Sequence, residues 1–170
     1  MSSKSKELQT LLRKDLFAAY RDVTSRPCPS QQLAFMRTVR HPAPRYYIGT
    51  KKAAEVVGSL LRGETRLIER MSPLRRRMYI ALKDEVLRLS QRREYQGASL
   101  KFIVSFAIAQ PAAEFYITSE TFRRIFRNAK RYGVEFEWKE AKKTSRQYTN
   151  YKDNKPREAV YRGKLLHILS

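Results

Sequence analysis

Cationic side chains gather on a predicted helix in the C-terminal half of the chain. Its apolar positions, Phe122, Ile125 and Phe126, are spaced to form one buried stripe. The opposite side carries five basic residues: Arg123, Arg124, Arg127, Lys130 and Arg131. Guanidinium and ammonium groups bind phosphate oxygens, so this side suits a nucleic-acid backbone, with a solvated helix face as the plainer alternative. Thr118 and Ser119 begin the helix, where their hydroxyls can either cap it or hold a phosphate.

An arginine triplet, Arg75, Arg76 and Arg77, lies in the first turn of a helix predicted to begin after Ser72. Cations at a helix N-terminus oppose the helix dipole, at a cost of roughly 0.3–1 kcal/mol. A bound polyanion would offset that cost. The triplet is therefore a second candidate for phosphate binding.

The N-terminal half carries a shorter basic group near its third predicted helix. Lys51 and Lys52 follow Thr50, which is expected to cap that helix. Arg45 lies just before it, in an extended aromatic segment. If the position of Arg45 faces the ligand, this half contacts phosphate there and the other half, with Glu114 at the matching position, does not.

The C-terminal segment 134–170 interleaves basic and aromatic residues. The candidates for binding are Lys142, Lys143, Arg146 and Tyr148. Such a composition is typical of an arm that follows a phosphate backbone and stacks on bases. A tail that only increases solubility is the alternative.

Residues capable of catalysis are few and widely spaced. His41, His167 and Cys28 match no zinc-site spacing, and Cys28 lies between two prolines without a neighbouring oxyanion motif. The six glycines are isolated, so no phosphate-binding glycine loop is present in the sequence. The acidic residues are scattered among lysines and arginines. We therefore expect no enzymatic activity, no metal and no cofactor.

A repeated segment organises the elements that would position these residues. Pro42-Ala43-Pro44-Arg45-Tyr46-Tyr47-Ile48 recurs as Pro111-Ala112-Ala113-Glu114-Phe115-Tyr116-Ile117, an offset of 69 residues. We name residues 42–48 the first corner and residues 111–117 the second corner. Apolar spacing predicts two helices before each corner and one after it, although the apolar run 100–109 could also be a strand. Ser30 and Ser99 are expected to cap the middle helices, and Gly63 is expected to end the third.

The sequence therefore predicts a mainly α fold built by tandem duplication of a three-helix, helix-turn-helix-like unit. A short C-terminal strand or irregular tail would follow, because Val134, Phe136 and Trp138 alternate with glutamates. The expected divisions are a flexible tail 1–6, unit one 7–63, a connector 64–71, unit two 72–133 and a basic appendage 134–170.

The charge of the whole chain points to a polyanionic partner. Lysine and arginine number 36 against 16 acidic residues, for a net charge of +20 at pH 7. A field of this sign favours DNA, RNA, anionic lipid or an acidic protein. No apolar run approaches the length of a membrane span, no secretory signal is visible, and there is one cysteine. We expect a cytoplasmic protein that does not bind a membrane.

The repeated pattern Pro-Ala-x-x-[Phe/Tyr]-Tyr-[Ile/Val] is accompanied by Arg-Gly-Glu at 62–64 and by Met-Ser-Pro-Leu-Arg-Arg-Arg-Met-Tyr at 71–79. Together these residues resemble a family of uncharacterised small basic proteins of gut anaerobes, their phages and their mobile elements. The resemblance covers roughly residues 8–132 and implies no function. A further likeness to helix-turn-helix DNA-binding proteins rests on architecture alone.

These features predict a nucleic-acid-binding protein, with duplex DNA favoured over RNA, acting in transcription regulation or in phage and mobile-element DNA transactions. The alternative is a phage or mobile-element assembly protein that binds an acidic partner or a packaged genome without reading sequence. Two linked units could replace a homodimer. We expect a monomer with an internal pseudo-two-fold, or a weak homodimer.

Overall fold

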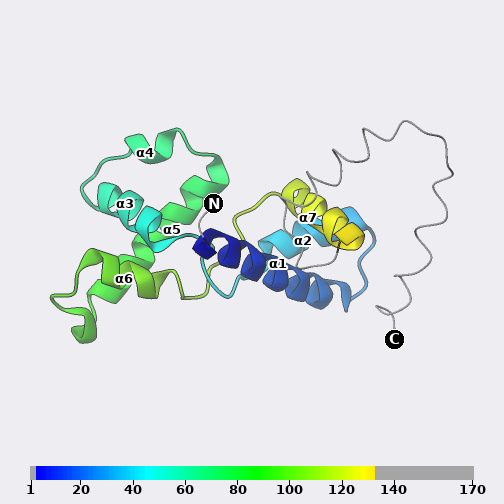
Figure 1. Cartoon of the computed structure of the whole chain (residues 1–170), viewed down its shortest axis with the longest axis horizontal. Helices are drawn as coiled ribbons and strands as arrows, with labels where there is room; N and C mark the ends of the chain where they lie inside the picture. Colours follow the sequence, from blue (N-terminus) through cyan, green and yellow to red (C-terminus); the bar gives the residue numbers. More distant parts are fainter. Residues whose placement is uncertain (1–2, 133–170) are drawn as a thin grey trace. The chain divides into compact units, whose positions relative to one another are not determined.

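The computed structural model describes residues 3–132, and within them the chain is mainly α-helical (Figure 1). The elements are α1 (Ser3–Thr24), α2 (Gln31–Arg40), α3 (Thr50–Leu61), α4 (Arg66–Glu69), α5 (Pro73–Ser90), the 3-10 turn η1 (Arg93–Tyr95), α6 (Leu100–Ala107) and α7 (Ser119–Tyr132). No strand occurs between residues 3 and 132, which confirms the mainly α class for that part of the chain. The strand or irregular tail expected for 134–170 lies outside it.

Serine residues begin the middle helix of each half. The Ser30 hydroxyl accepts a hydrogen bond from the Leu33 N–H at 3.2 Å, and the Ser99 hydroxyl accepts one from the Phe102 N–H at 3.3 Å. Both caps satisfy a backbone N–H that has no partner inside the helix. The caps predicted at Ser30 and Ser99 are confirmed, and the apolar run after Ser99 is a helix, α6.

The ends of α3 agree with the sequence at one terminus only. Thr50 is the first helical residue, and the capping position belongs to Gly49, so the cap predicted at Thr50 is wrong. At the other end Gly63 has φ +81° and donates its N–H to the Leu60 carbonyl at 3.0 Å. Glycine adopts this left-handed conformation without a steric penalty, which explains why the helix ends there.

The connector contains a short helix that the sequence did not indicate. Residues 64–71 carry charged side chains on both sides of Ile68, which belongs to α4 and is buried. Ile68 forms a small apolar cluster with Val56 of α3 and Tyr79 of α5. The connector therefore covers part of α3.

The helices pack across the expected division of the chain. α7 packs against α2, which also packs against α1, whereas α3 packs against α5 and α6 (Figure 1). α7 thus packs against a helix of the first half of the chain, and α3 packs against helices of the second half. One apolar core joins both groups, and its fully buried members include Leu16, Val57, Leu82, Val104 and Phe122.

The two corners meet in a short antiparallel bridge. Ala43 and Ala112 exchange backbone hydrogen bonds of 2.9 and 2.8 Å. The Tyr46 N–H donates to the Ile108 carbonyl at 2.9 Å, and the Phe115 N–H donates to the Val39 carbonyl at 3.1 Å. Each of these contacts has an equivalent at the 69-residue offset.

The rings of the corners stack in the same reciprocal way. Tyr46 stacks on Tyr116 with ring centroids 6.1 Å apart, and Phe115 stacks on Tyr47 at 5.9 Å. The equivalence ends at Tyr116, whose φ of +51° is the only positive value for a residue other than glycine between residues 3 and 132. This conformation is strained for an aromatic residue.

Candidate nucleic-acid interface

An aromatic cluster fixes the orientation of α7. Phe122 is fully buried, with ring centroids 5.3 Å from Phe35 of α2, 5.7 Å from Tyr20 of α1 and 5.9 Å from Phe17 of α1. Phe126 packs on the same rings, 5.0 Å from Tyr20. With this side held in the core, the opposite side of α7 must face solvent.

The exposed side of α7 is strongly basic. All five predicted residues are exposed there: Arg123, Arg124, Arg127, Lys130 and Arg131. The only acidic residue of the helix, Glu120, lies 3.5 Å from Arg123 and 3.4 Å from Arg127. Exposed pairs of this kind contribute about 0–1 kcal/mol, so a phosphate can compete for both arginines. The Lys130 ammonium lies 5.0 Å from the centre of the Phe126 ring.

The start of α7 is capped by its own side chains. The Thr118 hydroxyl accepts the Thr121 N–H at 3.1 Å and contacts the Thr121 hydroxyl at 2.9 Å. Capping therefore accounts for Thr118. Ser119 lines a hollow of about 160 Å³ with Gln32 of α2 and with Arg123.

Two basic residues of α2 were not among the predicted site residues. Arg37 and Arg40 are exposed on the helix that packs against α7. The sequence contained the signal, because both lie opposite the apolar stripe of α2. Their relevance depends on α7 being the neighbour of α2, which the order of the elements does not indicate.

The basic residues of α3 are confined to its first turn. Lys51 and Lys52 are exposed, and Lys52 pairs with Glu55 at 2.9 Å. Farther along, Val56, Val57, Gly58 and Ser59 are buried because α4, α5 and α6 cover the helix. α3 thus offers a much smaller cationic surface than α7.

The three arginines in the first turn of α5 lie in three different surroundings. Arg76 donates to the carbonyls of Ile68 at 3.3 Å and Glu69 at 2.9 Å, so it caps α4. Arg77 pairs with Glu114 of the second corner at 2.5 Å. Arg75 lines a groove beside the corners. Two of the three side chains have structural partners, which the sequence could not show because α4 was not predicted and Glu114 is distant along the chain.

The groove between the corners has a volume of about 390 Å³, and Arg45, Lys52 and Arg75 are its cationic residues. The Arg45 Nε is buried and has no hydrogen-bond partner. Burial raises the pKa of Tyr46 to about 12. Burial, and then the hydrogen bond that its hydroxyl donates to Asp15, raises the pKa of Tyr47.

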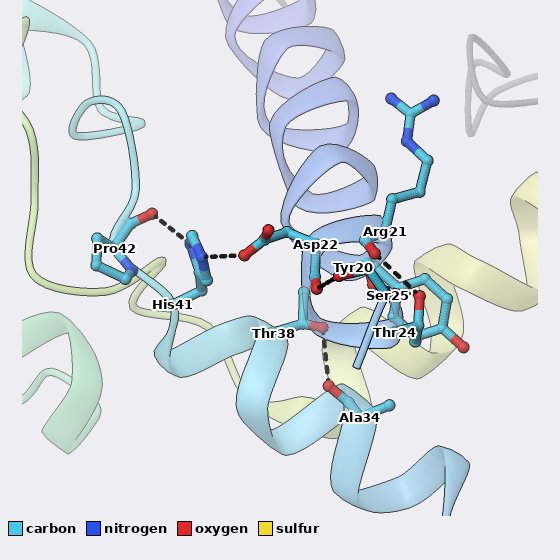
Figure 2. A network of polar contacts seen from close by, with 9 residues as sticks. All are labelled: Tyr20, Arg21, Asp22, Thr24, Ser25, Ala34, Thr38, His41 and Pro42. Carbon is cyan, nitrogen blue, oxygen red and sulfur yellow. Dashed lines mark hydrogen bonds and ion pairs between the residues drawn. The ribbon is translucent and has the colours of Figure 1, made fainter. Parts of the chain in front are cut away.

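A histidine–aspartate pair joins α1 to the end of α2. His41 lies between Asp22 and Pro42 (Figure 2), with Nε2 3.1 Å from the Asp22 carboxylate and Nδ1 3.0 Å from the Pro42 carbonyl. Both partners are acceptors, and they occupy both ring nitrogens. The nearby Thr38 hydroxyl donates to the Ala34 carbonyl.

The remaining predicted residues, Lys142, Lys143, Arg146 and Tyr148, lie outside the described part of the chain. Between residues 3 and 132 no three His, Cys, Asp or Glu side chains cluster as metal ligands would. Over the same residues no helix combines the length and apolarity needed to cross a bilayer. No family model, curated protein or solved structure matches the chain significantly.

Proposed function

We propose that this chain binds nucleic acid, duplex DNA in preference to RNA, through the exposed side of α7. The observation that carries the proposal is the division of α7 into an anchored aromatic side and a side with five cations against one carboxylate. A rigid helix that presents several cations can neutralise successive phosphates. Arg37 and Arg40 of the adjacent α2 extend the cationic surface available to a backbone.

The finer architecture is part of the same proposal. We infer a tandem duplication of a three-helix unit related by a pseudo-two-fold, supported by corner contacts that recur at the 69-residue offset. In this arrangement the helix-turn-helix-like pairs are α2 with α7 and α6 with α3. Since α3 is covered, DNA contact concentrates on the α2–α7 side, and the protein needs no paired half-sites.

The biological setting follows from this activity as a proposal. A cytoplasmic protein without catalysis, acting in transcription regulation or mobile-element DNA transactions, is consistent with a cationic helix. A second candidate is an assembly protein. It is favoured by exposed aromatic rings on α6, Phe102 at 50% and Phe106 at 40% exposure, which could contact a protein partner.

A salt titration with matched variants tests the nucleic-acid proposal. Replacing Arg123, Arg127 and Lys130 with glutamine removes three charges from α7, and replacing Arg66, Arg70 and Arg93 removes three exposed charges elsewhere. Each lost phosphate contact lowers the slope of log K against log salt by about 0.9, so the α7 variant should lose up to about 2.7 for random duplex. The control should lose much less.

Removing the acidic residue of α7 is a second test, in which affinity for DNA should change in the opposite direction. Glu120→Gln removes the carboxylate next to Arg123 and Arg127 and should strengthen binding to duplex DNA. Duplex DNA, single-stranded DNA and RNA are compared in parallel. Equal slopes for the two triple variants would refute a role for α7, and absence of binding to all three polymers at low salt would favour the assembly protein.

A further inference from the structure

The groove between the corners combines cations with an aromatic lining. Its walls come from both corners and from α1, α3 and α5, and they include Tyr46, Tyr79, Phe115 and Tyr116. A volume of about 390 Å³ lies within the range of small-molecule sites, about 300–1,000 Å³. No residue of α7 lines it, so it is separate from the proposed nucleic-acid interface.

Arg45 is the polar group least satisfied by the protein itself. Its Nε is buried without a hydrogen-bond partner, and its guanidinium forms no ion pair with the described residues. Because Nε is closed to solvent, a ligand in the groove would contact the terminal N–H groups of Arg45, which is a lining residue. A guanidinium presents parallel N–H donors that match the oxygens of a phosphate.

The surrounding charges favour a dianion. Arg75 also lines the groove and forms no ion pair within residues 3–132, and Lys52 is shared with Glu55 at 2.9 Å. Among the lining residues within 3–132, the one acidic side chain is Glu114, which pairs with Arg77 at 2.5 Å. Two arginines without carboxylate partners match a phosphate monoester, whose charge near pH 7 is about −1.5 to −2, better than a single carboxylate.

The groove is also where the two halves differ. At the 69-residue offset Arg45 corresponds to Glu114, and Tyr116 adopts φ +51° whereas its equivalent Tyr47 has no positive φ. Strained backbone conformations persist where surrounding structure holds them, and they gather at ligand sites. The backbone contacts of the corners are shared by both halves, so the bridge itself does not require these differences.

We propose that this groove binds a single nucleotide, with the phosphate on Arg45 and Arg75 and the base against the half-buried rings of Tyr47 and Tyr116. Aromatic side chains stack on bases without regard to their identity. The nucleotide is either free or the 5′-terminal unit of a nucleic acid, and the two share this chemistry.

Calorimetry on the full chain tests the proposal with four probes: adenosine monophosphate, adenosine, inorganic phosphate and a 5′-phosphorylated oligonucleotide. We expect the monophosphate to bind at least tenfold more tightly than adenosine or phosphate. A loss of affinity on removing the 5′-phosphate from the oligonucleotide, without binding of the free nucleotide, would also support the site and would assign it to a nucleic-acid end.

Two variants separate this site from a structural role of Arg45 and from the α7 interface. Arg45→Gln should weaken binding of the monophosphate, or of the 5′-phosphorylated end, at least tenfold with an unchanged thermal midpoint, and Arg45→Lys should give an intermediate affinity. Arg123→Gln should leave this binding unchanged, because α7 does not line the groove. Inorganic phosphate binding as tightly as the nucleotide, or equal affinities for Arg45→Gln and the original chain, would overturn the proposal.

Discussion

Replacing Phe122 with alanine should remove the anchor that holds α7 to α1 and α2. The side chain is fully buried, and four other rings surround it with centroid distances of 5.3–6.2 Å. An aromatic side chain buries about 150–250 Å². At about 25 cal/mol/Å², and allowing for the methyl group that remains, the lost burial amounts to about 3–4 kcal/mol. A residual cavity and lost edge-to-face contacts bring the expected cost to about 3–5 kcal/mol.

Urea unfolding followed by circular dichroism measures this cost as a change in the free energy of unfolding. Phe102→Ala is the matched control, because it is the same chemical change at a ring that is 50% exposed on α6. The control should cost roughly 1 kcal/mol, since most exposed sites tolerate substitution. Equal costs for the two variants would show that α7 is not packed in the core as described, and the orientation of its basic side would then lose its physical basis.

Two further predictions concern the exchange of helices and the buried tyrosine. Cutting the chain into fragments 1–71 and 72–170 separates α3 from α5 and α6, and α7 from α2. A 1:1 mixture should therefore show more helical circular dichroism than the sum of the separate fragments. A stable folded monomer of either fragment alone would contradict the packing. Burial raises the pKa of Tyr46 from 10.0 to about 12, so between these values the unfolded chain loses the proton first and the free energy of unfolding should fall as pH rises. Tyr46→Phe, which copies Phe115, should reduce that fall, and an identical alkaline profile would contradict the assignment.

Local structure could be predicted from the sequence because its causes are local. Ser30 and Ser99 satisfy N–H groups three residues ahead, and Gly63 supplies the left-handed turn after α3. The stripe that Phe122 and Phe126 form on α7 required only helical spacing. The basic side of α7 follows from the same spacing, so this part of the candidate site could be predicted from the sequence.

The partners of individual arginines could not be predicted from the sequence, because those partners lie far away along the chain. Arg76 caps α4, the short helix whose Ile68 is buried against Val56 and Tyr79. Arg77 reaches Glu114, which lies 37 residues away. A run of three arginines looks uniform in sequence, yet only Arg75 keeps its guanidinium for the groove.

The packing of α7 on α2, and of α3 on α5 and α6, could not be predicted for a different reason. If the chain is duplicated as we propose, similar surfaces receive α3 and α7, so apolar spacing alone is satisfied by either pairing. The two corners pair through Ala43 and Ala112, at the points where the chain leads to α3 and to α7. Alanine suits that position because both residues are nearly fully buried, 1% and 3% exposed, and a larger side chain would separate the two backbones. The recurrence of alanine in both corners therefore follows from its burial at the bridge, and the two corners differ at a less buried position nearby, Arg45 and Glu114.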